Sequence, residues 1–129
     1  MKILFTIALA LLLTGCSSSN FPPGPESAIV VMHTHSFEPA TVTIQSGQTV
    51  RWENKSILWH TVTDKPYVAK DPSHVALPKG AESFDSGRVH ANKSYWQTFT
   101  VPGTYKYICR PHEANGMLGT IIVQPAGHG

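Results

Sequence analysis

Three side chains that bind soft metal ions lie in one short segment near the C-terminal end of the sequence. Cys109 comes first, His112 follows, and Met117 ends the segment. A thiolate, an imidazole and a thioether together suit copper, because zinc sites rarely use methionine and hard cations prefer oxygen. The loop therefore indicates a copper ion that alternates between Cu(I) and Cu(II). Such a centre needs a second imidazole, and His60 is the candidate.

Turn-forming residues around this loop bring its donors toward one point. A β-strand that ends at Cys109 directs this side chain inward through its alternation of faces. Pro111 fixes its own φ and disfavours a helix at the residue before it, so the chain turns at once toward His112. Gly116 allows a second sharp turn, from which Met117 approaches the metal. The alternative is a buried cysteine beside an unrelated histidine and a core methionine.

Segments outside the loop resemble successive landmarks of the cupredoxins, in particular the plastocyanin and pseudoazurin branch of small blue-copper electron carriers. They are Phe37-Glu-Pro39, Ile44-Gln-Ser-Gly47, Val50-Arg-Trp52-Glu-Asn54, Trp59-His60-Thr-Val62, Phe84-Asp-Ser-Gly87, Val101-Pro-Gly103-Thr-Tyr105 and Gly119-Thr-Ile-Ile-Val123. The resemblance implies one copper ion, with His60, Cys109 and His112 as its strong ligands. It also implies that Met117 is the long axial ligand.

The resemblance further implies how the electron moves. A carrier of this family needs no substrate pocket, so we expect no enzyme but outer-sphere electron transfer through His112. Apolar side chains beside His112 are expected to form a small docking surface for a transient redox contact. The apolar candidates are Pro39, Ile57, Leu58, Ala114 and Leu118, and His35 stands where the family often has an apolar docking residue. A further hypothesis is that protonation of His35 modulates docking near neutral pH.

Three residues near the expected ligands bear on the copper site or on the electron route. The Thr61 hydroxyl is expected to hold the Arg110 backbone near Cys109. Pro111 has no N–H and cannot donate a hydrogen bond to the cysteine sulfur. Ile108 occupies the position at which plant plastocyanins place a tyrosine used as a second electron route. The acidic surface cluster of plant plastocyanins is also missing from this sequence. We therefore expect a c-type cytochrome or a copper oxidoreductase as partner.

The first residues have the order of a bacterial lipoprotein signal. A lysine and an apolar run too short for an ordinary membrane span end in Leu13-Thr-Gly-Cys16, which is similar to a lipobox. We expect a signal peptide at 1–15 and a lipidated Cys16 at the start of a flexible tether at 16–27. The protein would then be extracytoplasmic and lipid-anchored, facing the periplasm or the cell surface. An ordinary signal peptide with an incidental cysteine is the alternative.

Residues 28–124 consist of short β-branched and aromatic segments separated by turn residues, and a tail follows at 125–129. Seven or eight such segments predict an all-β fold, a two-sheet Greek-key β-sandwich. The expected strands are 28–32, 41–44, 49–52, 60–63, 95–99, 105–109 and 119–123, with a weaker one at 81–84 and a helical turn within 67–74. The residues expected in or beside the core are Phe37, Trp52, Phe84, Phe99, Tyr105 and Tyr107.

Charge narrows the function classes. The formal net charge is +2, and loss of Lys2 with the signal peptide brings the chain nearer to neutrality, with no long charged run. Neither nucleic-acid binding nor a strongly charged docking surface is indicated, and we expect a monomer. The alternative functions are a copper chaperone or storage protein, and a catalytic copper protein with a second metal site near His33 and His35. A structural adhesion sandwich would leave the copper-suited donors unexplained.

Overall fold

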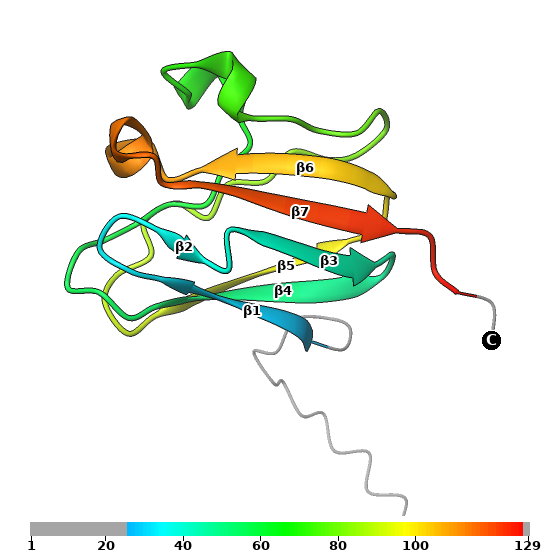
Figure 1. Cartoon of the computed structure of the whole chain (residues 1–129), viewed down its shortest axis with the longest axis horizontal. Coiled ribbons are helices and arrows are strands. Elements are labelled where there is room, and N and C mark those ends of the chain that lie inside the picture. The colour runs from blue at the N-terminus through cyan, green and yellow to red at the C-terminus, as the bar shows by residue number, and fades with distance from the viewer. Residues whose placement is uncertain (1–25, 128–129) are drawn as a thin grey trace, which may run out of the picture.

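Within the part of the chain that the structure describes, seven β-strands in two sheets make up the fold (Figure 1). The computed structural model describes residues 26–127. The strands are β1 (Glu26–Met32), β2 (Phe37–Glu38), β3 (Thr41–Gln45), β4 (Gln48–Asn54), β5 (Ser94–Phe99), β6 (Gly103–Ile108) and β7 (Leu118–Gln124). The predicted all-β, two-sheet sandwich is confirmed.

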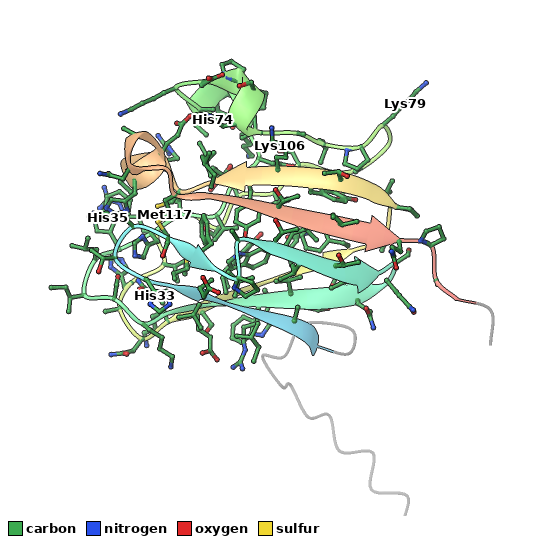
Figure 2. All side chains as sticks on the ribbon, viewed as in Figure 1. His33, His35, His74, Lys79, Lys106 and Met117 are labelled. Atoms are coloured by element: carbon green, nitrogen blue, oxygen red, sulfur yellow. The ribbon has the colours of Figure 1, made fainter. Side chains whose placement is uncertain are left out.

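Each sheet mixes parallel and antiparallel neighbours. One sheet has the order β2-β1-β4-β5 and the other the order β3-β7-β6. β1 runs parallel to β4 and β3 runs parallel to β7, whereas β5 and β6 join their neighbours antiparallel. The chain therefore crosses between the sheets repeatedly. Figure 2 shows Met117, one of the residues expected to bind metal, at one end of this sandwich, the same end as His35.

Aromatic side chains fill the space between the sheets. Trp52 of β4 is fully buried, and its ring lies 5.4 Å from that of Tyr107 of β6. Its Nε1–H donates a 3.1 Å hydrogen bond to the Tyr107 hydroxyl, so the one polar atom of the indole is satisfied. All the aromatic residues predicted for the core are at most 4% exposed: Phe37, Trp52, Phe84, Phe99, Tyr105 and Tyr107. That prediction is confirmed.

Two expected strands are wrong within the described residues. The segment 60–63 forms isolated bridges instead of a strand: its first residue pairs with Val89 and its last with both Asp85 and Ile108. Because the segment changes partner within a few residues, it cannot build a continuous ladder. The segment 81–84 is also irregular, although Phe84 at its end is buried in the core.

Among residues 26–127, three short 3₁₀-helices lie in the loops: η1 (Pro66–Val68), η2 (Pro72–His74) and η3 (Arg110–Asn115). The first two confirm the helical turn expected within 67–74. The helix η3 was not expected, because Pro111 was predicted to disfavour a helix at Arg110. In the structure, Arg110 is the first residue of η3. A proline at one of the first two positions of each helix supplies a fixed helical φ and removes an N–H that has no partner there.

The predictions for the N-terminal segment fall outside the described residues. The signal peptide at 1–15, Cys16 and most of the tether at 16–27 belong to that part of the sequence, as do the last residues of the tail, 128 and 129. Within 26–127, no helix has the length and apolar character needed to cross a membrane.

Candidate metal centre

The structure brings three of the four expected metal donors together. The Sγ atom of Cys109 lies 3.5 Å from Nδ1 of His60 and 3.4 Å from Nδ1 of His112. The two Nδ1 atoms are 3.1 Å apart. Edges of this length put all three atoms within reach of one first-row metal ion, whose bonds to nitrogen and sulfur are about 2.0–2.3 Å long. Among the histidine, cysteine, aspartate and glutamate side chains of residues 26–127, these three form a group close enough together to hold a metal ion.

Different parts of the fold supply these donors. His60 follows the loop after β4, Cys109 follows β6, and His112 lies in η3. His60 and Cys109 are fully buried, whereas His112 is half-buried. One imidazole is therefore sheltered by the core, and the other lies nearer to solvent.

Met117 lies directly after η3 and is fully buried. Its carbonyl accepts a 3.1 Å hydrogen bond from the Cys109 N–H, and its own N–H donates to the His112 carbonyl at 3.2 Å. Gly116, at a φ of 79°, makes the reversal that returns the chain to β7. Figure 2 shows the Met117 sulfur at the same end of the sandwich as His35. A thiolate, two imidazoles and a nearby thioether fit copper better than zinc or a hard cation.

A hydrogen-bond chain that the sequence did not reveal orients His60. Its Nε2 lies 2.7 Å from the Ser56 hydroxyl, and that hydroxyl donates to the Asn54 side-chain carbonyl at 3.0 Å. When His60 Nε2 donates its proton to Ser56, the lone pair of Nδ1 is left facing Cys109. Partners of this kind fix the tautomer of a metal-binding histidine and the orientation of its ring.

Burial sets the protonation of the donors in the metal-free protein. Burial, followed by the nearby His112 and His35, lowers the pKa of His60 from 6.5 to about 4. Burial and His35 also lower the pKa of His112. Burial raises the pKa of the Cys109 thiol, and hydrogen bonds from Thr61 and His112 oppose this rise. At pH 7 both imidazoles are therefore neutral and free to bind a metal, whereas the thiol releases its proton when the metal binds.

The low pKa of His60 makes the stability of the metal-free protein depend on pH. Below pH 6.5 the unfolded chain takes up a proton at His60, which the folded chain does not accept until about pH 4. Stability should therefore fall by roughly 3 kcal/mol as the pH is lowered from 6.5 to 4. Urea denaturation of the metal-free protein across this range measures the effect. The His60→Gln variant should lose most of this slope, and an unchanged slope would contradict the assigned pKa.

Thr61 holds the ligand loop next to His60. Its hydroxyl accepts a 2.8 Å hydrogen bond from the Arg110 N–H, the contact expected from the sequence. Its own N–H points at the Cys109 sulfur, 3.5 Å away, a donor that sequence reasoning missed. Pro111 lacks an N–H. Thr61 thus supplies the thiolate with a hydrogen bond that Pro111 cannot give.

Glu113 is a buried carboxylate that sequence reasoning also missed. It is 3% exposed and accepts hydrogen bonds from the Lys70 and Asp71 N–H groups at 2.7 and 3.0 Å. His74 Nδ1 lies 3.0 Å from the same carboxylate. Burial alone would raise the pKa of Glu113, but these hydrogen bonds outweigh it and lower that pKa. The carboxylate therefore fastens η3 to the segment that contains η1 and η2.

The residues expected to form a docking surface are mostly solvent-accessible. Ala114 is exposed in η3, Leu58 is half-buried, and Ile57 is 93% exposed in the loop before His60. The His35 ring is exposed and packs edge-on against the His112 ring, with centroids 5.0 Å apart. The two remaining candidates are exposed Pro39 and half-buried Leu118.

Ile108 gives no second route to the surface. The side chain is fully buried, and its backbone exchanges hydrogen bonds with Thr63. The side chain at this position is therefore enclosed by the protein, as expected for a residue that offers no electron route to solvent. His112 remains the donor residue nearest to solvent.

Comparisons with known proteins agree with this geometry. The chain matches the family of copper binding proteins described as plastocyanin/azurin over residues 29–124. It is 32% identical to chloroplastic plastocyanin of Tetradesmus obliquus over 120 residues, 93% of this chain and 73% of that protein. It is 38% identical to plastocyanin of Scenedesmus fuscus over 89 residues, 68% of this chain and 86% of that protein. Amicyanin from Paracoccus versutus has a TM-score of 0.59 at 27% identity, with 81% of this chain and 86% of amicyanin covered.

The fold and the cluster of two histidines and a cysteine are those of a cupredoxin, a blue copper protein. The chain belongs to the plastocyanin/azurin family of copper-binding proteins. It binds one copper ion, and its class is that of electron carriers and not of enzymes.

Proposed function

We propose that this protein is a type 1 copper electron carrier in which His60, Cys109, His112 and Met117 hold the copper. The single observation that carries this proposal is the triangle of Sγ and two Nδ1 atoms, with edges of 3.1 to 3.5 Å, on a buried cysteine. Copper in such a site alternates between Cu(I) and Cu(II) and so accepts or gives one electron.

The surroundings of the donors support electron transfer because they resist rearrangement. His60 is held by Ser56, the Arg110 backbone is held by Thr61, and η3 is held by Glu113. Donors fixed in this way keep one geometry in both oxidation states of the metal. Little reorganisation should then accompany each transfer, which favours a fast carrier over a protein that exchanges its copper.

We assign the electron exit to His112. It is half-buried, whereas His60 is fully buried, and exposed Ala114 and Ile57 lie in the loops that carry these two histidines. A small apolar surface of this kind suits a brief redox contact and not a permanent complex. The partner would be a c-type cytochrome or a copper oxidoreductase, and the protein would act as a monomer.

The place of action is proposed from the N-terminal sequence. Residues 1–15 would direct export, Cys16 would carry the lipid, and 16–27 would tether the domain at 28–124 to the membrane. The protein would then work in the periplasm or at the cell surface, close to membrane-bound redox partners. Radiolabelled fatty acid should label the wild-type protein but not the Cys16→Ala variant. Labelling of both proteins, or of neither, would contradict the anchor.

Charge placed on the docking surface tests the proposed exit. Ala114→Glu and Ala114→Lys should each slow electron transfer to a small c-type cytochrome on the order of tenfold, because either charge loses solvation in the apolar contact. The absorption spectrum of the copper site should not change. Stopped-flow mixing of the reduced protein with oxidised cytochrome measures the rate.

The same substitutions at exposed Ala126, beyond the end of β7, serve as matched controls and should leave the rate within twofold. Opposite effects of the two charges at Ala114 would indicate simple long-range attraction or repulsion. Rates that match those of the Ala126 controls would contradict an exit at His112.

A further inference from the structure

A hollow of about 390 Å³ beside the metal donors has a basic lining. Three of its lining residues, Lys70, Arg88 and Arg110, carry cationic side chains, and no acidic residue lines it. These three residues come from distant parts of the sequence, so the sequence alone did not indicate a charged surface. Trp59, Thr61 and Pro111 complete the part of the wall that faces the metal donors.

The three cations are available to a ligand. All three residues are exposed, and among residues 26–127 none of the three side chains forms a salt bridge with a carboxylate. The nearby Glu113 carboxylate accepts hydrogen bonds from two backbone N–H groups and faces His74, so it pairs directly with none of the three cationic side chains. Three like charges around one hollow repel each other, and an anion between them would relieve that repulsion.

One of these cationic groups is held in place, and the backbone that carries a second is fixed. The Arg88 guanidinium lies over the Trp59 ring, 4.4 Å from its centroid, in a cation–π contact. The Lys70 backbone is fixed by Glu113 through a 2.7 Å hydrogen bond. A pre-positioned guanidinium loses less conformational freedom when it binds a carboxylate, and its planar fork suits that group.

The hollow is next to the copper donors. Trp59 directly precedes His60, and Arg110 lies between Cys109 and His112 in the sequence. Thr61 is shared by both sites, because it lines the hollow and its N–H faces the Cys109 sulfur. A group bound here therefore lies beside the proposed electron exit.

We infer that this basic hollow receives a carboxylate side chain of the redox partner and so sets the orientation in which that partner docks. The inference rests on the proposed electron-carrier function. It specifies in addition that the contact surface of the partner is acidic. Trp59 lines the hollow and lies two residues after the exposed Ile57 in the same loop, so one partner can cover the apolar and the basic parts together. Charge complementarity of this kind steers the encounter and suppresses wrong partners.

Small redox complexes of opposite charge test the inference. Reduced protein passes one electron to hexacyanoferrate(III), giving hexacyanoferrate(II) and the Cu(II) protein. Arg88→Gln and Lys70→Gln should each slow this reaction on the order of tenfold at low ionic strength, the factor for one unit charge and a trianion roughly 9 Å apart in water. Oxidation by the tris(phenanthroline)cobalt(III) cation should not slow.

Lys79→Gln is the matched control, because it removes the same charge at a site that Figure 2 shows far from Met117 and His35. It should leave the hexacyanoferrate rate within twofold. Equal effects of Lys79→Gln and Arg88→Gln would overturn the inference, because net charge alone would explain them. Failure of both complexes to oxidise the protein would instead refute the carrier function itself.

Binding without electron transfer gives an independent readout. Titration with redox-inert hexacyanocobaltate(III) should shift the Trp59 indole N–H signal in a nitrogen–proton NMR spectrum, and Arg88→Gln should weaken the binding of this trianion on the order of tenfold. No shift at Trp59 in the wild-type protein would overturn the inference.

Cytochrome c and its succinylated form, whose lysines carry carboxylates, extend the test to proteins. Arg88→Gln should slow the reaction with the succinylated form more than that with the native form. Equal slowing would overturn the inference. Co-sedimentation with phosphatidylglycerol vesicles that Arg88→Gln abolishes would assign the hollow to a membrane surface instead, and would also overturn it.

Discussion

Replacement of Asn54 by alanine is expected to lower the free energy of unfolding by about 3 kcal/mol. Asn54 is fully buried at the end of β4, and its Nδ2 donates to the Leu58 carbonyl at 2.7 Å and to the Val89 carbonyl at 3.0 Å. Its Oδ1 accepts from the Ser56 N–H and hydroxyl. The alanine variant leaves these groups without their partners inside the protein. Urea denaturation followed by tryptophan fluorescence measures the loss.

The same replacement should weaken copper binding on the order of tenfold, because the Ser56 hydroxyl that orients His60 loses the nearer of its two acceptors, and the Leu58 carbonyl, the other one, loses the Asn54 amide that holds it. Competition with a copper chelator measures this affinity. Asn115→Ala, at an exposed position in η3, is the matched control and should change neither quantity measurably. If Asn54→Ala behaved like this control, the role of Asn54 in holding the His60 loop would be refuted.

Gly119→Ala is expected to destabilise the protein by about 3 kcal/mol, through overpacking and not through a lost contact. A Cβ at this position in β7 would overlap the ring and hydroxyl of Tyr107 and would lie 2.6 Å from its Cε1. The Tyr107 ring cannot move aside easily, because it is fully buried between the Trp52 and Phe37 rings. The thermal midpoint and urea denaturation should both show the loss.

Gly127→Ala adds the same methyl group where the nearest atom is 3.9 Å away, and it should be neutral. A second test combines Gly119→Ala with Tyr107→Leu. The double variant should be less destabilised than the sum of the two single variants, because the clash is already removed. Additive effects would show that Tyr107 is not what excludes a side chain at Gly119.

The proximity of Cys109 and His112 was predictable because the sequence information for it is local. Cys109, Pro111, His112 and Met117 follow one another closely, and the turn residues between them determine how the chain reverses. The buried aromatic residues were predictable for a similar reason, since alternation along each strand gives their side. His60 could be proposed as a metal donor only because a copper centre with these donors needs a second imidazole and because the family resemblance points to this histidine.

Contacts between distant segments could not be predicted. The carboxylate of Glu113 binds the backbone of Lys70, and nothing in either segment alone indicates that they meet. Ser56 is an ordinary loop serine until the fold places it 2.7 Å from His60. The basic hollow has the same origin, because Arg88 and Arg110 become neighbours only in three dimensions. Long-range pairing likewise explains why 60–63 is not a strand, although its composition favours one.

Absorption spectroscopy of the copper-loaded protein tests the central claim most directly. Addition of Cu(II) should produce an intense band at about 600 nm, from charge transfer between the Cys109 thiolate and copper, and a reductant should bleach it reversibly. Cys109→Ser should abolish the band because it removes the sulfur. A wild-type protein that stays colourless with Cu(II), or a band that survives in Cys109→Ser, would contradict a type 1 copper centre at this site.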